Sequence, residues 1–495
     1  MPAVGSYRTL INNATAVFAG RIAAIAFGVA LATMLFRTLG AERYGQWSLL
    51  TLLAGYSTLV DFGLSSAVER RVASLAAHDT HASIPATINT SLTALVAGAA
   101  IAEVLVLAVL SVVSPAAADT WRAIAILPIC SGVTLAALAV GAVLAGQQRM
   151  VLLQSWRTSG LAVGTAAVGG AVALGQDALD TLLVLYTIGS VLTFGLAWAT
   201  LRRTLPDLRL RPEWDRDAAR DLFWFGGVVQ FATMVPPLAE YAFRLIIGAR
   251  FGLAYSGVYD LGARAAMVPR SLAGSLFSAM IPFAVQTERA GGAAALRGLV
   301  RTTARHVALI ILPASALLVA FAGPLVTVWL GEAPLSDQVR DVLVLLLVAH
   351  AAGAVAVPAA MVGRALGRPA PEAIGTTVAF LAAVVLARFV PSFELATFIL
   401  WGLPAIAGFA CWLWLDRTAG IGFVNGLDAV LAVAVAAAAF VIGLLLMPTG
   451  HAPVRVLLHL AGAGLAALAA AGLVETGYRR RWRTTVVPAG PEYPQ

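Results

Sequence analysis

The sequence predicts an all-α, polytopic membrane protein with about fourteen transmembrane helices. Hydrophobic residues make up 60% of the 495 positions and charged residues only 12%, whereas a soluble domain carries roughly a quarter charged residues. Apolar segments long enough to cross a bilayer recur along the chain, and arginines concentrate in alternate connections between them. Both patterns are typical of proteins that cross a membrane many times.

A bilayer core of roughly 30 Å requires about 20 apolar residues in a helix. The N-terminal apolar run is longer than a signal-peptide core and shows no obvious cleavage site, so we expect it to be retained as the first membrane helix. The fourteen predicted spans are 12–36, 44–68, 88–113, 121–145, 158–174, 181–201, 222–247, 255–285, 307–328, 340–363, 374–389, 396–415, 427–447 and 454–474.

The arginines predict the topology. The even-numbered connections and the two termini hold 22 arginines, and the opposite side with its helix ends holds seven. Under the positive-inside rule both termini are cytoplasmic, which requires an even number of spans. We therefore expect a multi-pass protein of the cell inner membrane, whose outer connections are about a dozen residues or fewer and too short for a folded domain.

The composition also excludes several kinds of chemistry. The chain has a net charge of +8 but contains no lysine, so it has neither the P-loop lysine of an ATPase nor an amine for Schiff-base catalysis. Its two cysteines, Cys130 and Cys411, lie in apolar segments without a neighbouring Cys/His cluster, so we expect no metal site and no cofactor. We expect a protein that is not an enzyme and that has no nucleic-acid partner.

A short internal repeat predicts two related lobes. Leu39-Gly40 to Gly45-Gln-Trp47 and Phe251-Gly252 to Gly257-Val-Tyr259 share the pattern apolar-Gly-x4-Gly-x-aromatic at an offset of 212 residues. Internal repeats are a common construction in transporters, although a match this short also arises by chance. The predicted division is a six-helix lobe at 1–201, a cytoplasmic linker at 202–221, a second six-helix lobe at 222–415, two additional helices at 427–474 and a cytoplasmic tail at 475–495.

The residues around this repeat resemble a known family. LGAERYGQWSLL (39–50), LVDFGLSSAVERRVA (59–73) and FRLIIGARFGLAYSGVYDLGARAAMVP (243–269) are similar to the oligosaccharide flippases of the multidrug/oligosaccharidyl-lipid/polysaccharide superfamily. The resemblance covers roughly residues 8–415. One departure is Phe243, where many relatives carry an acid before the basic residue of helix seven.

The resemblance implies a V-shaped, two-lobed bundle around a central cavity. It also implies a substrate, an undecaprenyl-diphosphate-linked oligosaccharide, flipped from the inner to the outer leaflet by alternating access for O-antigen, capsule or exopolysaccharide assembly. Membrane lipids and polysaccharide polymerase or assembly proteins are the implied partners. A cation-coupled drug antiporter of the same superfamily and a membrane glycosyltransferase or polymerase remain alternatives; the short outer loops argue against the second.

Charges inside the predicted spans are the candidate site residues. A charge at the bilayer centre costs at least about 2.5–3.5 kcal/mol on insertion scales, so each should face a cavity or a partner. Arginine suits a diphosphate because its planar fork binds two phosphate oxygens and stays charged. The candidate substrate-binding residues are Arg21, Arg244, Arg264 and Arg270, with ion pairing to a carboxylate as the structural alternative for each.

The acids in the spans are candidates for ion coupling: Glu103, Glu240 and Asp260. Glu240 precedes Arg244 by four residues, and Asp260 precedes Arg264 by four, so each pair shares a helix face and could be a self-neutralised structural pair. The first span contains Arg21 and no acid, which argues against the antiporter, because a cation antiporter requires a buried acid. Asp61 is expected to make a helix-end contact, and His350 is expected to be a packing residue.

Overall fold

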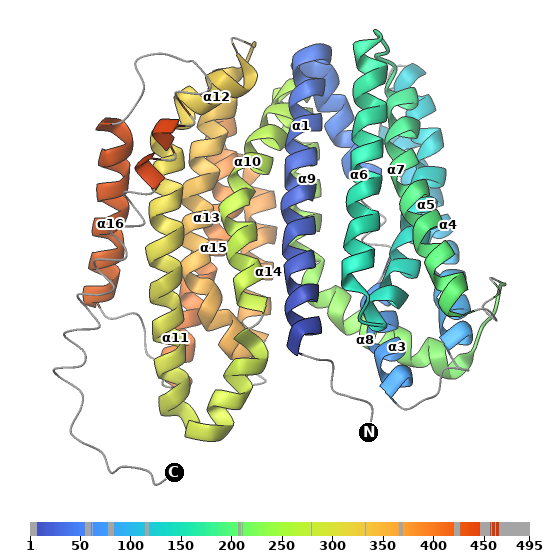
Figure 1. The fold of residues 1–495 in the computed structure, drawn as a ribbon. Helices are drawn as coiled ribbons and strands as arrows, with labels where there is room; N and C mark the ends of the chain where they lie inside the picture. Colours follow the sequence, from blue (N-terminus) through green and yellow to red (C-terminus); the bar gives the residue numbers. More distant parts are fainter. Residues whose placement is uncertain are drawn as a thin grey trace. The chain divides into compact units, whose positions relative to one another are not determined.

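A computed structural model describes the protein over residues 7–54, 61, 63–77, 84–113, 118–205, 209, 211–278, 280–331, 333–365, 370–419, 426–445, 456, 458–460 and 462–464. Every regular element in these ranges is an α-helix, which confirms the predicted all-α class (Figure 1). The number fourteen stays a prediction.

Two compact units make up the chain, Met1–Leu261 and Gly262–Gln495. The first contains α1 (Tyr7–Ala54), α3 (Leu64–Ala77), α4 (Ile84–Val113), α5 (Ala118–Gly146), α6 (Met150–Ala173), α7 (Leu179–Thr204), α8 (Arg216–Thr233), α9 (Val235–Phe251) and the first part of α10 (Leu253–Ser278). The second contains the remainder of α10 and α11 (Met280–Ala320), α12 (Ala322–Leu330), α13 (Ser336–Ala365), α14 (Ala370–Ala387), α15 (Phe393–Ala419) and α16 (Gly426–Leu445). The lobe boundaries predicted from the sequence stay a prediction.

Six helical segments among the described residues are long and apolar enough to cross a membrane: Thr15–Leu52, Arg122–Gly146, Leu179–Thr204, Gly298–Ala320, Ser336–Pro358 and Phe393–Trp414. Pro371–Ala387 and Val433–Leu445 are shorter apolar helices. Spans of this length and composition identify a multi-pass membrane protein.

α1 is two helices joined at a kink. Its 48 residues would extend about 72 Å as one straight helix, far beyond a bilayer core. Gly40 breaks it with φ 80° and ψ 168°, a conformation that essentially only glycine adopts. Gly252 separates α9 from α10 with φ 101° and ψ 158°. The first glycine of both copies of the repeated motif therefore makes the same turn.

Packing within the first unit is densest around α7, which lies beside α5 and α6, while α1 lies against α6 (Figure 1). A buried aliphatic cluster from α3, α4, α5 and α7 includes Val72, Ile88, Val143 and Leu201. In the second unit α13 packs on α11 and α15, and α16 packs on α11 through a cluster that includes Leu317, Phe321 and Ala439.

Side chains of α4 hold the connection between α7 and α8 in place. The Asn89 amide donates to the Arg209 carbonyl at 3.0 Å and to the Glu213 carboxylate at 2.9 Å. The Thr93 hydroxyl accepts a hydrogen bond from the Glu213 backbone N–H at 3.2 Å. At the start of α8, Asp221 is paired with both Arg70 and Arg71 of α3, at 2.6 and 3.0 Å. The connection is therefore docked onto the first unit.

Candidate functional site

The structure places the seven predicted site residues in different environments. Arg21 is exposed on α1, and Arg264 is half-buried on α10. Glu240, Arg244 and Asp260 meet in one buried cluster. The side chains of Glu103 and Arg270 lie outside the described residues.

We call the meeting point the Arg244 cluster; it consists of Tyr44, Ser48, Glu240, Arg244 and Asp260. The Arg244 guanidinium is paired with the Glu240 carboxylate at 2.6 Å and with the Asp260 carboxylate at 2.5 Å. The Tyr44 hydroxyl donates a short hydrogen bond to the other oxygen of Asp260, and the Ser48 hydroxyl is 3.3 Å from Arg244. One cation thus connects two acids, and one of those acids is tied to α1.

Burial makes these contacts strong. The Asp260 side chain is 0% exposed and that of Arg244 is 10% exposed. The ring of Tyr259 lies beneath the guanidinium, 5.4 Å from its carbon. Charges removed from water require partners, because removing one partner from a buried pair costs about 3–5 kcal/mol. The Arg244 cluster therefore holds α1, α9 and the first part of α10 together within the first unit.

The second glycines of the repeated motif bring the two turns into contact beside this cluster. A Cβ added to Gly45 would stand 1.9 Å from the carbonyl oxygen of Leu253. A Cβ added to Gly257 would stand 3.0 Å from the carbonyl oxygen of Ala41 and 3.1 Å from the nitrogen of Gly45. Each copy of the motif therefore packs its glycine against the backbone of the other copy, and neither position has room for a side chain.

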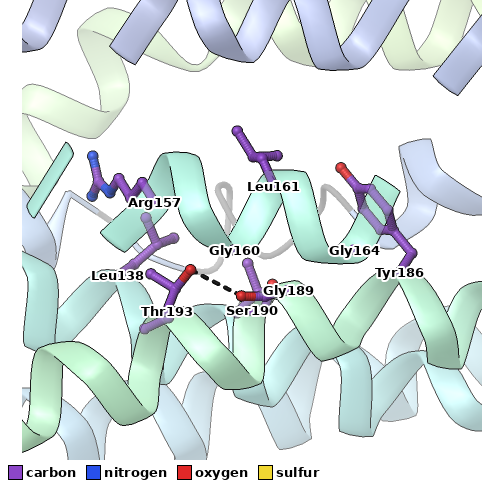
Figure 2. A pocket seen from close by; sticks show the side chains of 11 residues that line it. Leu138, Arg157, Gly160, Leu161, Gly164, Tyr186, Gly189, Ser190 and Thr193 are labelled. Atoms are coloured by element: carbon purple, nitrogen blue, oxygen red, sulfur yellow. Dashed lines mark hydrogen bonds between the residues drawn. The ribbon is translucent and has the colours of Figure 1, made fainter. Parts of the chain in front are cut away.

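A separate cavity of about 230 Å³ lies within the first unit, among α5, α6 and α7. At its wall, Gly160 and Gly189 place the backbones of α6 and α7 against each other, since a Cβ on Gly160 would stand 2.4 Å from the Gly189 carbonyl oxygen. Arg157 lies at one end of the cavity and Tyr186 at the other (Figure 2). Thr134, Ser190 and Thr193 add hydroxyl groups to the wall.

Sequence reasoning did not assign Tyr44, Ser48 or Arg157 to a site. Tyr44 was part of the repeated motif, but its pairing with Asp260 joins residues 216 positions apart. Arg157 was one of the 22 arginines that predict the cytoplasmic side, and it was given no further role. The glycines that follow it at positions 160 and 164 nevertheless have the spacing of close helix packing. That spacing was the available signal for a tight α6–α7 interface.

The described residues contain no group of three or more His, Cys, Asp or Glu side chains that could hold a metal ion. The polar groups of the Arg244 cluster and of the cavity beside Arg157 are instead arginines, hydroxyls and paired carboxylates. Such groups bind and release charged ligands or hold a conformation. The helices and these sites define an all-α, multi-pass membrane protein.

Comparison with known proteins gives the family. Residues 34–336 match the polysaccharide biosynthesis protein family, and this match covers more than half of the chain. The chain belongs to that family. No curated protein matches the sequence.

Solved structures share the fold. A lipid II flippase, MurJ, in an inward closed conformation has a TM-score of 0.73 at 10% identity, over 94% of this chain and 99% of that one. An inward-facing MATE-family multidrug resistance transporter has a TM-score of 0.62 at 14% identity, over 81% and 94%. The Vibrio cholerae MATE transporter VcmN in the bent form gives 0.55 at 16% identity, over 83% and 97%. The resemblance is thereby confirmed in its family, which is that of the polysaccharide biosynthesis proteins, and in its fold, which the flippase and MATE structures share.

Proposed function

We propose that this protein is a transporter that flips an undecaprenyl-diphosphate-linked oligosaccharide from the inner to the outer leaflet of the cytoplasmic membrane. The family match carries the proposal, because it connects the chain to polysaccharide biosynthesis over residues 34–336. The fold shared with a lipid II flippase supports it, because that protein's name describes a lipid-linked substrate. The product would enter the assembly of O-antigen, capsule or exopolysaccharide beside a polysaccharide polymerase.

Arg21 is the residue we assign to the substrate diphosphate. It is exposed on α1, within an apolar segment that contains no acid before Glu42. A guanidinium in such a segment can offer two parallel hydrogen bonds to a phosphate at any physiological pH. Arg264 and Arg270 would extend the cationic path along α10. Contact between substrate and Arg244 would first require its two carboxylate pairs to open.

The Arg244 cluster is suited to holding one end of the transporter closed. It lies beside the turns at Gly40 and Gly252, which the arginine distribution places on the extracytoplasmic side. In the proposed cycle the cluster stays intact while the cytoplasmic side admits the head group, and it separates when the outer side opens. Glu240 and Asp260 would be the ion-coupling acids, because protonation of either one weakens its hold on Arg244.

The proposed arrangement in the cell follows the same charge distribution. Both termini face the cytoplasm of an inner membrane, and fourteen spans form lobes at 1–201 and 222–415 with two further helices at 427–474. The prenyl tail stays in the lipid while the diphosphate and the glycan pass between the lobes. The arginine-rich cytoplasmic connections attract lipid-linked phosphate to the entry side.

An export assay in the native host tests this function. We expect Arg21→Ala to lower surface polysaccharide at least tenfold while the amount of membrane-inserted protein is unchanged. Arg37→Ala is the matched control, because Arg37 is an exposed arginine of the same helix beside the Gly40 turn. Normal export by the Arg21→Ala strain would remove the assignment of Arg21, and normal surface polysaccharide in a deletion strain would remove the proposed function.

The second candidate function is a cation-coupled drug antiporter. The fold shared with MATE-family transporters and the buried acid Asp260 favour it. This function predicts that deletion raises sensitivity to cationic drugs and leaves polysaccharide export intact. Drug-resistance profiling and polysaccharide staining of one deletion strain therefore separate the two candidates.

A further inference from the structure

The cavity among α5, α6 and α7 has an unusual cationic wall. Arg157 lies seven residues after Met150, where α6 begins, and its Nη2 is 3.4 Å from the position that a Cβ would take on Gly141 of α5. The glycine therefore leaves room for the guanidinium to lie against α5. Gly160 and Gly164 follow on the same face of α6, because residues three and seven positions apart point the same way on a helix.

The hydrogen-bonding capacity of Arg157 is not used within the described part of the chain. No residue described there forms a hydrogen bond with it or an ion pair within 4.0 Å. The charge of Glu69 on α3 acts on Arg157 electrostatically, but the two groups are not in contact. A half-buried guanidinium has five N–H donors, and these donors border a cavity rather than a carboxylate.

Hydroxyl groups form the other polar part of the cavity wall, and the remaining lining is apolar. The Tyr186 hydroxyl forms no hydrogen bond with any residue that the structure describes, and its ring packs edge-on against Trp47 at 6.0 Å. The Thr134 hydroxyl lies 2.9 Å from the Cys130 carbonyl oxygen and 3.2 Å from the Ser190 hydroxyl, and Ser190 presents a hydroxyl oxygen at the cavity wall. Arg157 and Gly164, which is beside Tyr186, are about 10 Å apart along α6.

We propose that this cavity binds a small phosphate ester of lipid-headgroup size. The phosphate would accept hydrogen bonds from Arg157, and a polar substituent such as glycerol would reach Ser190 and Tyr186. The cavity of about 230 Å³ is smaller than the roughly 300–1,000 Å³ of pockets for drug-sized ligands, so it suits a group of headgroup size. A phosphate neutralises the partly desolvated arginine, which otherwise bears the cost of a buried charge. The proposal does not rest on the proposed transport function.

The source of the phosphate is either an anionic lipid or a soluble ester, and two conditions distinguish them. The first places the purified full-length protein in nanodiscs of zwitterionic phosphatidylcholine and adds sn-glycerol 3-phosphate. The second uses nanodiscs that contain phosphatidylglycerol and no soluble phosphate. Thermal unfolding is followed by circular dichroism at constant ionic strength, because a ligand that binds only the folded state raises the unfolding midpoint.

We expect at least one condition to raise Tm of the wild type by roughly 1–3 °C. Arg157→Gln should abolish the rise, and Leu161→Trp should abolish it by filling the cavity. Tyr186→Phe should weaken binding about fivefold through loss of one hydrogen bond. Arg43→Gln is the matched control and should keep the full rise, since Arg43 is a half-exposed arginine of the same unit that is paired with Asp177.

The outcomes distinguish a lipid headgroup from a soluble phosphate ester, and some of them would overturn the proposed site. If Arg157 is required for a rise in Tm with phosphatidylglycerol and glycerol phosphate gives no rise, the ligand is a lipid headgroup. If glycerol phosphate also raises Tm in an Arg157-dependent way, the phosphate ester itself is sufficient. An equal rise in the wild type and in Arg157→Gln, or no rise in either condition, overturns the proposal. If Arg157→Gln does not fold, Leu161→Trp and Tyr186→Phe give the same decision without changing the charge.

Discussion

Replacing Asp260 with asparagine removes the negative charge at the centre of the Arg244 cluster with almost no change in shape. The aspartate accepts from the Arg244 guanidinium at 2.5 Å and from the Tyr44 hydroxyl, and it is fully buried. After the substitution, Arg244 keeps its pair with Glu240 at 2.6 Å and loses its charged pair with residue 260. The variant therefore tests whether the cluster connects α1 to α9 and α10.

The expected cost follows from the burial of the cluster. Breaking a buried ion pair by removing one partner costs about 3–5 kcal/mol. Tyr44→Phe alone removes one hydrogen bond to a charged group, which costs about 1.5–3 kcal/mol, and it keeps the ring that packs edge-on against Phe36 at 5.7 Å. Because the charged acceptor for the Tyr44 hydroxyl is already absent in Asp260→Asn, the double variant should cost less than the sum, by about 0.5–3 kcal/mol.

A double-mutant cycle on the detergent-purified protein measures this coupling, with unfolding followed by far-ultraviolet circular dichroism. Ser48→Ala provides an internal scale, because its contact with Arg244 is longer at 3.3 Å and should cost only about 0.5–1.5 kcal/mol. Additive costs for Tyr44→Phe and Asp260→Asn would refute the reasoning. A cost of Asp260→Asn below 1 kcal/mol would refute it as well, because the cluster would then not bear the burial penalty assigned to it.

Two further predictions concern the first unit. Gly160→Val should prevent accumulation of folded protein, because even the Cβ of the new side chain would stand 2.4 Å from the carbonyl oxygen of Gly189. The control is Gly170→Ala in the same helix, whose added Cβ meets nothing within 4 Å. This control should leave the free energy of unfolding unchanged or raise it by about 0.4–1 kcal/mol. Western blotting and size-exclusion profiles of the two variants compare them, and equal yields would contradict the close packing assigned to α6 and α7. Hydrogen bonding from Asn89 holds the pKa of Glu213 below its usual value of 4.5. The hydrogen bond between Asn89 and the Glu213 carboxylate should therefore be present above pH 4.5 and lost as the pH falls through the lowered pKa of the folded state. The protection of residues 211–215 against hydrogen exchange, measured relative to the intrinsic rate at each pH, should therefore fall only in acid. This dependence should be lost in Glu213→Gln, and the same fall in protection between pH 8 and 6 would exclude Glu213 as its cause.

The sequence by itself determined the class of this protein and the positions of two turns between helices. Bilayer thickness requires long apolar segments, and this local property can be counted along the chain. Gly40 and Gly252 could be predicted as turn residues because each stands at the same point of a repeated motif. Both have a positive φ, which permits a turn between helices. The motif residues also gave the family, which residues 34–336 match.

Only the tertiary structure decided which charges meet. The sequence placed Asp260 four residues before Arg264, and the structure shows the same carboxylate bound to Arg244 and Tyr44. Helical spacing reveals neighbours within one helix, whereas a pair between helices depends on how closely their backbones approach. Glycines decide how closely the helix backbones approach here, because a missing side chain allows two backbones into contact. These glycines are Gly45, Gly257, Gly160 and Gly189. The sequence showed Arg157 only as one of many arginines in predicted connections, and the structure places it at the wall of a cavity among α5, α6 and α7.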